Sequence, residues 1–243
     1  MGLYNMSLVN DFVARIQVNS SRVYLDSFAR DAAASLPHGA KVLDAGAGHG
    51  PYRQHFSNMQ YESADFCKID KQYGEITYIC DLTTIPVEND RYDLVFLSQV
   101  LEHVPDPKKV LEEIHRVIKP GGVLWLSAPL FYEEHEIPYD YYRYTQYGFT
   151  YLLESSKFTV NQIDWLEGYF GTLSYQLRVM ARALPIRPVH FGGGLLGILF
   201  SVLVILVRPL FFVLSLLFSR LDLRNKYTLS GHCKNYAIVC TKK

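Results

Sequence analysis

The feature that most constrains the fold is an apolar segment that runs directly into three alternating glycines. The segment reads Val42-Leu43-Asp44-Ala45-Gly46-Ala47-Gly48-His49-Gly50. A strand that ends in glycines leaves bare backbone against which a ligand can lie, and the residues that follow present backbone amides to that ligand. In open α/β sheets, ligands bind beyond the carboxyl ends of the strands. The chain is therefore expected to form an α/β sheet with a ligand site at this turn.

The glycine spacing argues against a dinucleotide site. The last glycine of a GxGxxG turn would fall on Pro51 when counted from Gly46, and on Arg53 when counted from Gly48. The pattern is instead DxGxGxG, which begins at Asp44. This pattern resembles motif I of the class I S-adenosylmethionine-dependent methyltransferases, in which the glycine turn passes under the methionine part of the cofactor.

Acidic residues follow the next predicted strands at suitable distances. Asp65 lies where a second strand, near residues 61–66, should end, and its carboxylate could accept hydrogen bonds from both ribose hydroxyls. A third strand is predicted over 77–82 and a fourth over 91–98. In the family resembled, the equivalents of Asp81 and Leu82 contact the adenine. The cofactor-binding residues implied are Asp44, Ala45, Gly46, Gly48, Asp65, Phe66, Asp81, Leu82, Ser98 and Gln99.

Residues 97–122 add an independent resemblance. They contain Leu101-Glu102-His103-Val104-Pro105-Asp106-Pro107 and then Arg116-Val117-Ile118-Lys119-Pro120-Gly121-Gly122, which is similar to a recurrent pattern of type 11 and ubiquinone-pathway methyltransferases. A helix over 110–118 and a fifth strand over 123–128 are predicted. The resemblance spans roughly residues 40–130. It implies S-adenosylmethionine as cofactor and S-adenosylhomocysteine as product.

The segment after the fifth strand is expected to hold the methyl acceptor. Seven tyrosines lie between Tyr132 and Tyr151, together with a histidine, carboxylates and Arg143. Aromatic faces with polar rims suit a sugar or a phenol, and an arginine can hold a phosphate or carboxylate. The segment also resembles the HxxPxDYxRYT loop of small methyltransferases of surface-polysaccharide and lipid-linked glycan pathways. The expected substrate residues are Tyr132, Glu134, Asp140, Tyr142 and Arg143.

An acceptor hydroxyl must lose a proton, and a histidine within hydrogen-bond reach is the natural base. His135 is the first candidate and His103 the second. No metal is expected to be required. Two structural interpretations stay open: Asp140 and Arg143 could be a pair that fixes the loop, and the segment around Glu102 could serve only as a turn.

A long apolar segment interrupts the second half of the chain. The predicted sixth strand, 158–165, and last strand, 235–241, are separated by some 70 residues, of which 191–218 carry Arg208 as their only charge. If both strands belong to one sheet, a single membrane crossing is excluded. Residues 195–207 and 210–218 are each shorter than the roughly 20 residues of a helical span. A shallow re-entrant hairpin or in-plane helix pair, bent near Arg208 and Pro209, is therefore predicted.

The charges around the apolar segment favour an anionic membrane surface. Residues 168–221 contain no acidic residue but five arginines: Arg178, Arg182, Arg187, Arg208 and Arg220. The alternatives are a buried core or a homodimer surface. The four cysteines lack metal-ligand spacing, and the formal net charge is zero, so neither a zinc site nor a nucleic-acid partner is expected.

The predicted fold is a Rossmann-like class I methyltransferase sheet of seven strands, the last one antiparallel, with helices on both faces. Residues 1–36 are expected to form an N-terminal helical cap, 37–167 with 227–243 the methyltransferase domain, and 168–226 a monotopic membrane-associating insertion between strands six and seven. Whether the N-terminal helices cap the cofactor or only pack on the sheet stays open.

The predicted function is O-methylation of a membrane-associated acceptor, such as a lipid-linked or surface glycan, at the cytoplasmic face of a membrane. A quinone-pathway O-methyltransferase that acts on a phenolic lipid is the second enzyme hypothesis. The third hypothesis is not an enzyme: the protein would be a membrane adaptor that binds S-adenosylmethionine (SAM) but does not catalyse a reaction.

Overall fold

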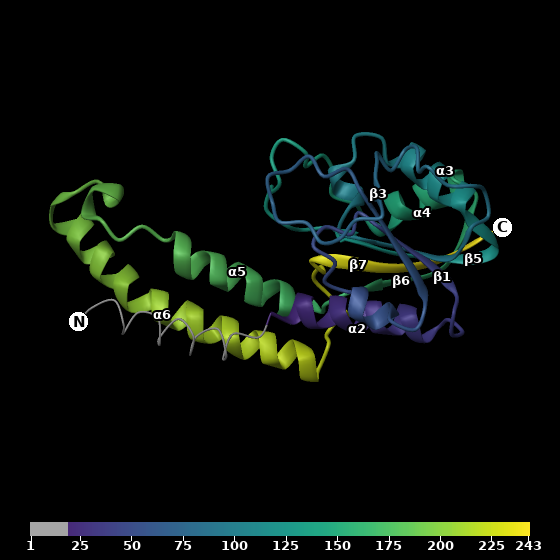
Figure 1. The fold of residues 1–243 in the computed structure, drawn as a ribbon. Helices are drawn as coiled ribbons and strands as arrows, with labels where there is room; N and C mark the ends of the chain where they lie inside the picture. The colour runs from purple at the N-terminus through teal and green to yellow at the C-terminus, as the bar shows by residue number, and fades with distance from the viewer. Residues whose placement is uncertain (1–18) are drawn as a thin grey trace, which may run out of the picture. The chain divides into compact units, whose positions relative to one another are not determined.

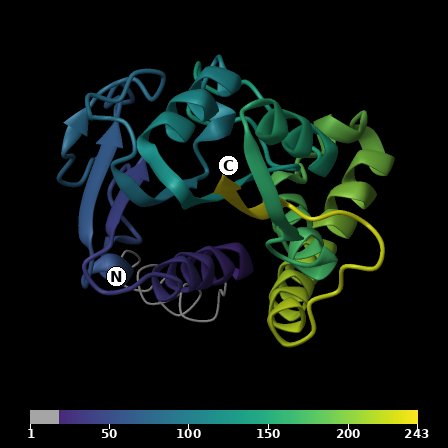
Figure 2. The ribbon, with the colours of Figure 1, turned by 90° about the vertical axis from the view of Figure 1, so that its right-hand side faces the viewer.

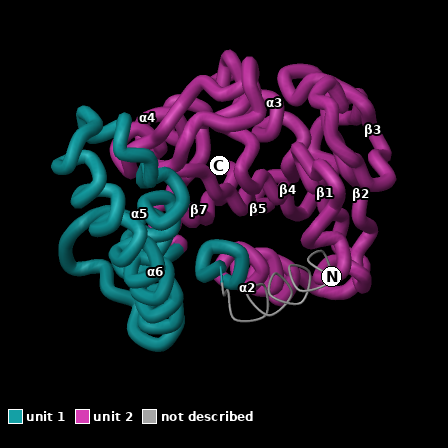
Figure 3. Tube along the Cα trace, turned by 90° about the vertical axis from the view of Figure 1, so that its left-hand side faces the viewer, with its two compact units in different colours: residues 1–23, 167–233 teal, residues 24–166, 234–243 magenta. Residues whose placement is uncertain are grey.

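The computed structural model describes residues 19–243, and the chain divides into two compact units (Figures 1 and 3). One unit consists of residues 24–166 and 234–243, and the other includes residues 167–233. The first half of the N-terminal segment expected as a cap, residues 1–18, lies outside the described residues. From Ser20 to Ala34 the chain forms helix α2.

A seven-stranded sheet organises the first unit, in the order β3-β2-β1-β4-β5-β7-β6. Strand β7 is antiparallel to β5 and β6, whereas the pairs from β3 through β5 are parallel. The predicted class I methyltransferase sheet is therefore confirmed. The strands are β1 (Lys41–Ala45), β2 (Gln60–Asp65), β3 (Tyr78–Ile79), β4 (Tyr92–Ser98), β5 (Ile118–Pro129), β6 (Phe158–Trp165) and β7 (Asn235–Lys242).

Helices cover both faces of this sheet. Helix α2 covers one face (Figure 2). There Leu25 and Phe28 pack in one cluster with Val42 and Phe96, and the ring centroids of Phe28 and Phe96 lie 5.9 Å apart. On the other face lie α3 (Pro107–Val117) and α4 (Gln146–Ser155) (Figure 3). Both faces of the central strands are thereby removed from water, which matches their continuous apolar sequence. The buried side chains of α3 recur at helical spacing: Val110, Leu111, Ile114 and Val117.

Two strands, β3 and β5, differ from their predicted bounds by more than one residue. Strand β5 begins at Ile118 rather than Val123, because its pairing with β4 shifts register after Tyr92 and the intervening residues form an irregular stretch around Gly121, whose φ is +75°. Strand β3 is confined to Tyr78 and Ile79, because the Asp81 carboxylate accepts hydrogen bonds from the backbone and hydroxyl of Thr83 and turns the chain.

The second unit is built on an antiparallel pair of helices, α5 (Tyr169–Ala183) and α6 (Gly194–Arg224), joined through the short η3 (Pro188–Phe191). The direction follows from the contacts: Phe170 stacks on Phe218, and the Ser174 hydroxyl donates to the Ser215 carbonyl. Figure 1 shows the two helices side by side.

The predicted break at Arg208 and Pro209 is wrong, because α6 is one helix of 31 residues that includes Pro209. The Arg208 guanidinium reaches across to α5, where it donates to the carbonyls of Ala181 and Arg182. These carbonyls lie in the last turn of α5, which leaves its final carbonyls without partners inside the helix. Arg208, which was predicted to mark a bend in its own helix, instead caps the C-terminal end of α5.

The carboxylate of Glu62 ties three strands together, and this contact can be tested. It accepts two hydrogen bonds from Arg91 and one each from the hydroxyls of Tyr78 and Tyr92. The bonds from Arg91 are the main cause that lowers the pKa of Glu62. Glu62→Gln is expected to lower the free energy of unfolding by about 1–2 kcal/mol, and Tm by about 3–6 °C, in a thermal scan at neutral pH.

The effect of Glu62→Gln should depend on pH. Because the pKa of the carboxyl is lower in the folded state, its stabilising contribution is present above the ordinary glutamate pKa of 4.5 and declines as the pH falls through the lowered folded value. The Tm gap between parent and variant should therefore narrow below pH 4.5. Glu112→Gln, at an exposed surface pair, is the control and should leave Tm unchanged. A constant gap down to low pH would contradict this account.

Candidate functional site

A cavity of about 220 Å³ opens at the carboxyl ends of β1, β2 and β4. Parallel pairing aligns these strands, so that Ala45 lies beside Ala64 and Asp44 beside Phe96. The three loops that follow the strands consequently meet at one edge of the sheet. This is where the sequence placed the ligand site.

The glycine turn after β1 adopts a backbone that favours glycine. Gly46, Gly48 and Gly50 have φ values of +77°, +58° and +72°. A Cβ on Gly46 would lie 2.3 Å from a methyl carbon of Val100, whereas a Cβ on Gly48 would have nothing within 4 Å. A side chain at Gly46 would therefore clash with Val100, whereas the space beside Gly48 is open to a ligand.

Asp65 and Asp81 line the cavity, and hydrogen bonds hold both of their carboxylates in place. The buried Asp65 accepts hydrogen bonds from the backbone amides of Gly48 (2.9 Å) and Cys67 (3.0 Å). The Asp81 carboxylate accepts from Thr83, and the backbone bond from that residue is the main cause that lowers its pKa. Both carboxylates are thereby oriented as acceptors for ligand hydroxyl or amino groups.

Apolar side chains line the same cavity as these two carboxylates. Phe66, Leu82, Val100 and Val104 line the same cavity, together with Gln99. Carboxylates that can hold hydroxyls, beside apolar walls that can cover a flat ring, fit a nucleoside. The open backbone at Gly48 fits a ligand that lies against the turn. The residues present therefore suit the adenosine and methionine parts of S-adenosylmethionine.

Four predicted cofactor residues lie beside or beneath the cavity rather than in its lining. Ala45 and Gly48 belong to the strand end and turn, and the Ser98 hydroxyl lies 2.9 Å from that of Ser127. Asp44 is buried and accepts a hydrogen bond from the Tyr61 hydroxyl. Burial raises the pKa of Asp44 to about 6, and the nearby Asp65 charge adds to the shift. The predicted residues in the lining are Gly46, Asp65, Phe66, Asp81, Leu82, Gln99 and His103.

His103 reaches the cavity, and His135 does not line it. His103 belongs to η2 (Leu101–His103), directly after β4, and its Nδ1 lies 2.6 Å from the carbonyl oxygen of Tyr139. Burial is the main cause that lowers the pKa of His103. The geometry therefore favours the second of the two predicted catalytic histidines as the one that faces a ligand.

The five predicted substrate residues lie outside the cavity lining. Arg143 makes a bidentate pair with Asp140, at 2.7 and 2.8 Å, and also donates to the carbonyls of Tyr132 and Glu133. The Asp140 carboxylate accepts the backbone amide of His135 as well. These contacts hold the loop in shape, which supports the structural interpretation of the pair. The Tyr142 hydroxyl donates to the Pro105 carbonyl, and Glu134 is exposed.

The sequence reasoning missed several residues of the lining. Residues 130–145, between β5 and α4, are the segment expected to hold the acceptor and are called the acceptor loop. Lys71 and Glu136 form an ion pair at 2.8 Å that joins the loop after β2 to the acceptor loop. The ring of Tyr139 packs edge-on against Phe66, with centroids 5.5 Å apart. The tyrosine-rich segment was the available signal, although it did not show which tyrosines face inward. The missed lining residues are Lys68, Lys71, Thr83, Val100, Val104, Pro105, Glu136, Tyr139 and Tyr141.

Comparison with known proteins identifies the family. A family model described as a methyltransferase domain matches residues 17–156. The ubiquinone biosynthesis O-methyltransferase of Coxiella burnetii is 30% identical over 102 residues, which cover 37% of this chain and 44% of that protein. The demethylmenaquinone methyltransferase of Renibacterium salmoninarum is 35% identical over 102 residues, covering 39% and 43%. The match spans less than half the length of these relatives.

Solved structures share the fold at low sequence identity. The Burkholderia thailandensis 1,6-didemethyltoxoflavin-N1-methyltransferase, solved with bound S-adenosylhomocysteine, has a TM-score of 0.54 at 16% identity, covering 99% of this chain and 89% of that one. The [4+2]-cyclase SpnF has a TM-score of 0.55 at 14% identity, covering 90% and 79%. Since one of these enzymes is a cyclase, the likeness establishes the fold and not the reaction. The family match, which covers more than half of the chain, establishes that the chain belongs to the methyltransferase-domain family.

Proposed function

We propose that this enzyme methylates a hydroxyl group of a membrane-associated acceptor at the cytoplasmic face of a membrane, and that the acceptor is a lipid-linked or surface glycan. The observation that carries the proposal is the outward-facing apolar surface of α6. A phenolic lipid of a quinone pathway is the second candidate acceptor, and the names of the relatives favour it. A lipid-linked glycan and a phenolic lipid are both lipids that carry a hydroxyl, so the same surface would serve either.

The cofactor residues are proposed from the cavity. Asp65 would hold the ribose hydroxyls, Asp81 and Leu82 the adenine, and the turn at Gly46 and Gly48 the methionine part. When bound, S-adenosylmethionine supplies a methyl carbon that the acceptor oxygen attacks as the carbon–sulfur bond breaks and its electron pair stays on sulfur. The protein contributes alignment of the acceptor and exclusion of water.

The acceptor is proposed to enter along the wall formed by the acceptor loop. Glu136, Tyr139 and Tyr141 line the cavity from this loop. His103 lines it from η2. Tyrosine rings beside charged groups can contact the faces of a sugar or phenol while polar groups orient its hydroxyl.

Helix α6 has the residue distribution of a helix in lipid. Its buried residues are small or polar, namely Gly197, Ser201, Ser215, Ser219 and Asp222. Its large apolar side chains are exposed instead, for example Leu195 at 74% and Leu206 at 69%. In water the opposite distribution is expected, whereas in membranes small residues mediate helix contacts and large apolar residues face the lipid.

The length and connectivity of this segment support a monotopic arrangement. One described helix, α6, is long and apolar enough to cross a membrane, with a mean hydropathy of 2.5 over its most apolar window. However, α6 and α5 together connect β6 to β7, which pair directly in one sheet. The chain must therefore return to the side from which it left. A helix in the membrane surface, or one that enters without crossing, satisfies this requirement, and the exposed Arg182, Arg187 and Arg220 would contact anionic headgroups.

A homodimer contact through the same face and a SAM-binding adaptor are the competing proposals. A dimer would bury the exposed leucines without lipid, and an adaptor would bind the cofactor without turnover. Cofactor calorimetry tests the assignment of the cofactor residues, and vesicle flotation tests the membrane surface independently.

The first test is the cofactor role of Asp65. Asp65→Asn replaces a charged acceptor, and calorimetry is expected to show S-adenosylhomocysteine binding weaker by about 10–100-fold, since a hydrogen bond to a charged group contributes about 1.5–3 kcal/mol. Asp70→Asn, at a nearby exposed position outside the cavity lining, is the matched control and should bind as the parent does. Equal affinity of Asp65→Asn and the parent would remove Asp65 from the cofactor site.

The second test is membrane binding through α6. Leu199, Leu203 and Leu206 are exposed by 56%, 54% and 69% and recur at helical spacing. Their combined replacement by Asn is expected to abolish flotation with vesicles of phosphatidylcholine and phosphatidylglycerol, because the apolar area available to lipid is lost. S-adenosylhomocysteine binding should be unchanged.

The control replaces two exposed tyrosines of the other unit, Tyr147 and Tyr151, by Ser. This variant should float with vesicles as the parent does. Flotation of the triple α6 variant at the parental level would contradict the proposed membrane surface. A parent that forms dimers and ignores vesicles would favour the homodimer.

A further inference from the structure

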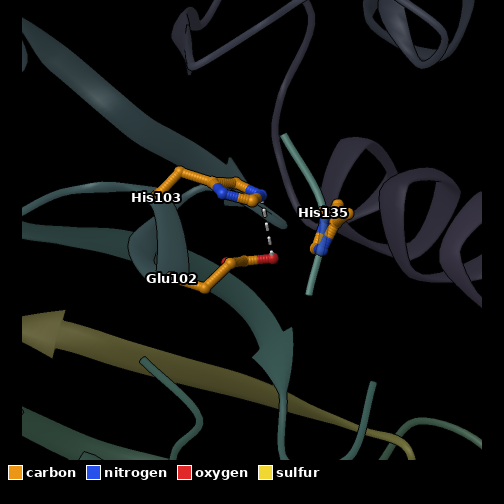
Figure 4. Close-up of side chains that lie close together, drawn as sticks. All are labelled: Glu102, His103 and His135. Atoms are coloured by element: carbon orange, nitrogen blue, oxygen red, sulfur yellow. Dashed lines mark ion pairs between the residues drawn. The ribbon is translucent and has the colours of Figure 1, made fainter. Parts of the chain in front are cut away.

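We propose that Glu102, His103 and His135 form a binding site for a divalent metal cation of the first transition row, beside the cavity at the ends of β1, β2 and β4. Figure 4 shows these three side chains gathered around one point. One donor atom from each residue lies within 4.8 Å of the others. The binding proposal stands on these residues alone, whereas the role given to the cation below rests on the proposed O-methylation.

The three residues come from two segments that the fold brings together. Glu102 and His103 are adjacent in η2, and His135 lies in the acceptor loop. The distance from His103 Nε2 to Glu102 Oε1 is 3.8 Å, too long for a hydrogen bond. The rings of His103 and His135 meet edge-on, with centroids 4.6 Å apart. Ligands at about 2.1 Å from a metal lie about 3.0–3.4 Å apart, so the most widely spaced donors would have to approach each other by up to about 1.4–1.8 Å.

The buried carboxylate of Glu102 provides the independent sign of a ligand. Glu102 has no exposed surface, and neither of its oxygens has a hydrogen-bond partner among the described residues. An unpaired carboxylate in the interior is costly, because both oxygens have lost their water without a replacement. Figure 4 shows the carboxylate of this side chain next to the two imidazoles. A cation at this point would supply the missing partner for the carboxylate.

The surroundings of the two imidazoles are those of metal ligands. Nδ1 of His103 lies 2.6 Å from the Tyr139 carbonyl, and Nδ1 of His135 lies 3.2 Å from the Glu133 carbonyl and 3.3 Å from a carboxylate oxygen of Asp140. Because these oxygens only accept, each Nδ1 carries the hydrogen, and each Nε2 keeps its lone pair. Oxygen acceptors that fix the outer nitrogen in this way orient metal-bound histidines and raise their basicity.

The donor set defines the class of cation. Two imidazoles and one carboxylate suit Mn²⁺, Fe²⁺, Co²⁺ or Zn²⁺, whereas Mg²⁺ and Ca²⁺ prefer oxygen ligands. Three protein ligands leave coordination positions for water or a substrate. His103 lines the cavity, so the open positions would face the acceptor side of the site.

A cation there would give both histidines a different role from the one predicted from the sequence, where they were bases and no metal was expected. A metal-bound hydroxyl is a stronger acid than a free one, so the acceptor oxygen could lose its proton near neutral pH. The proton would pass to a carboxylate of the cavity, for which Glu136 is placed, with Oε2 4.0 Å from His103 Nε2. The oxygen then keeps the electron pair that forms its bond to the methyl carbon.

The test uses Mn²⁺ alone, because the partly exposed Cys67 and Cys80 would compete for softer metals. The full chain is treated with a chelator, freed of it by gel filtration and titrated with Mn²⁺, and free Mn²⁺ is counted by electron paramagnetic resonance. One Mn²⁺ per chain is expected. Glu102→Gln, which keeps the shape of the side chain, and His135→Ala, at a partly exposed position, should each weaken binding at least about tenfold.

His38→Ala removes an exposed histidine outside the cluster and should bind Mn²⁺ as the parent does. A parent without one-site binding, or Glu102→Gln and His135→Ala variants that bind as tightly as the parent, would overturn the metal site. S-adenosylhomocysteine calorimetry on the same samples verifies their folding and separates the two proposals. Cofactor binding without Mn²⁺ binding would reject the metal site alone, and loss of both in the parent would reject the proposed function as well.

Discussion

The parallel pairing of β1 with β2 and β4 is the constraint on which the site depends. It places the glycine turn, Asp65 and the η2 segment at one edge of the sheet, although they are far apart in the sequence. The buried apolar side chains of these strands stabilise that pairing from both faces. A change that shifted the register of β1 would move the turn away from Asp65 and Val100 together. The chemistry of the cavity is therefore a consequence of how the sheet is packed.

The sequence was sufficient to predict the sheet and the edge of the sheet at which the cavity lies. Glycines with positive φ and carboxylates at strand ends have local causes, and such features can be predicted without knowledge of distant contacts. The acceptor half could not be predicted in the same way. Whether Arg143 meets a ligand or Asp140, and whether Tyr139 or Tyr142 faces the cavity, depends on how an irregular loop folds onto η2. The backbone amides of Tyr141 and Tyr142 bind the Glu102 carbonyl there, a contact between distant segments.

The apolar insertion shows a second limit of local reasoning. Proline and arginine in succession predicted a bend, but Arg208 finds its partners on α5, so α6 continues past Pro209. The small residues of α6 form a stripe that is recognisable once the partner helix is known. The apolar character of this segment is visible in the sequence, and the helix pair shows which face of α6 remains exposed. The membrane proposal thus depends on a distribution of side chains and not on hydropathy alone.

Methyl transfer to a membrane-associated acceptor is the central claim, and one measurement tests it directly. The purified enzyme is incubated with S-adenosylmethionine that carries a tritium-labelled methyl group, together with the membrane and soluble fractions of cells that lack the gene. The account predicts label in the lipid extract of the membrane fraction, with mass spectrometry showing a lipid-linked product heavier by one methyl group. Label confined to water-soluble acceptors, or no transfer to either fraction, would contradict it.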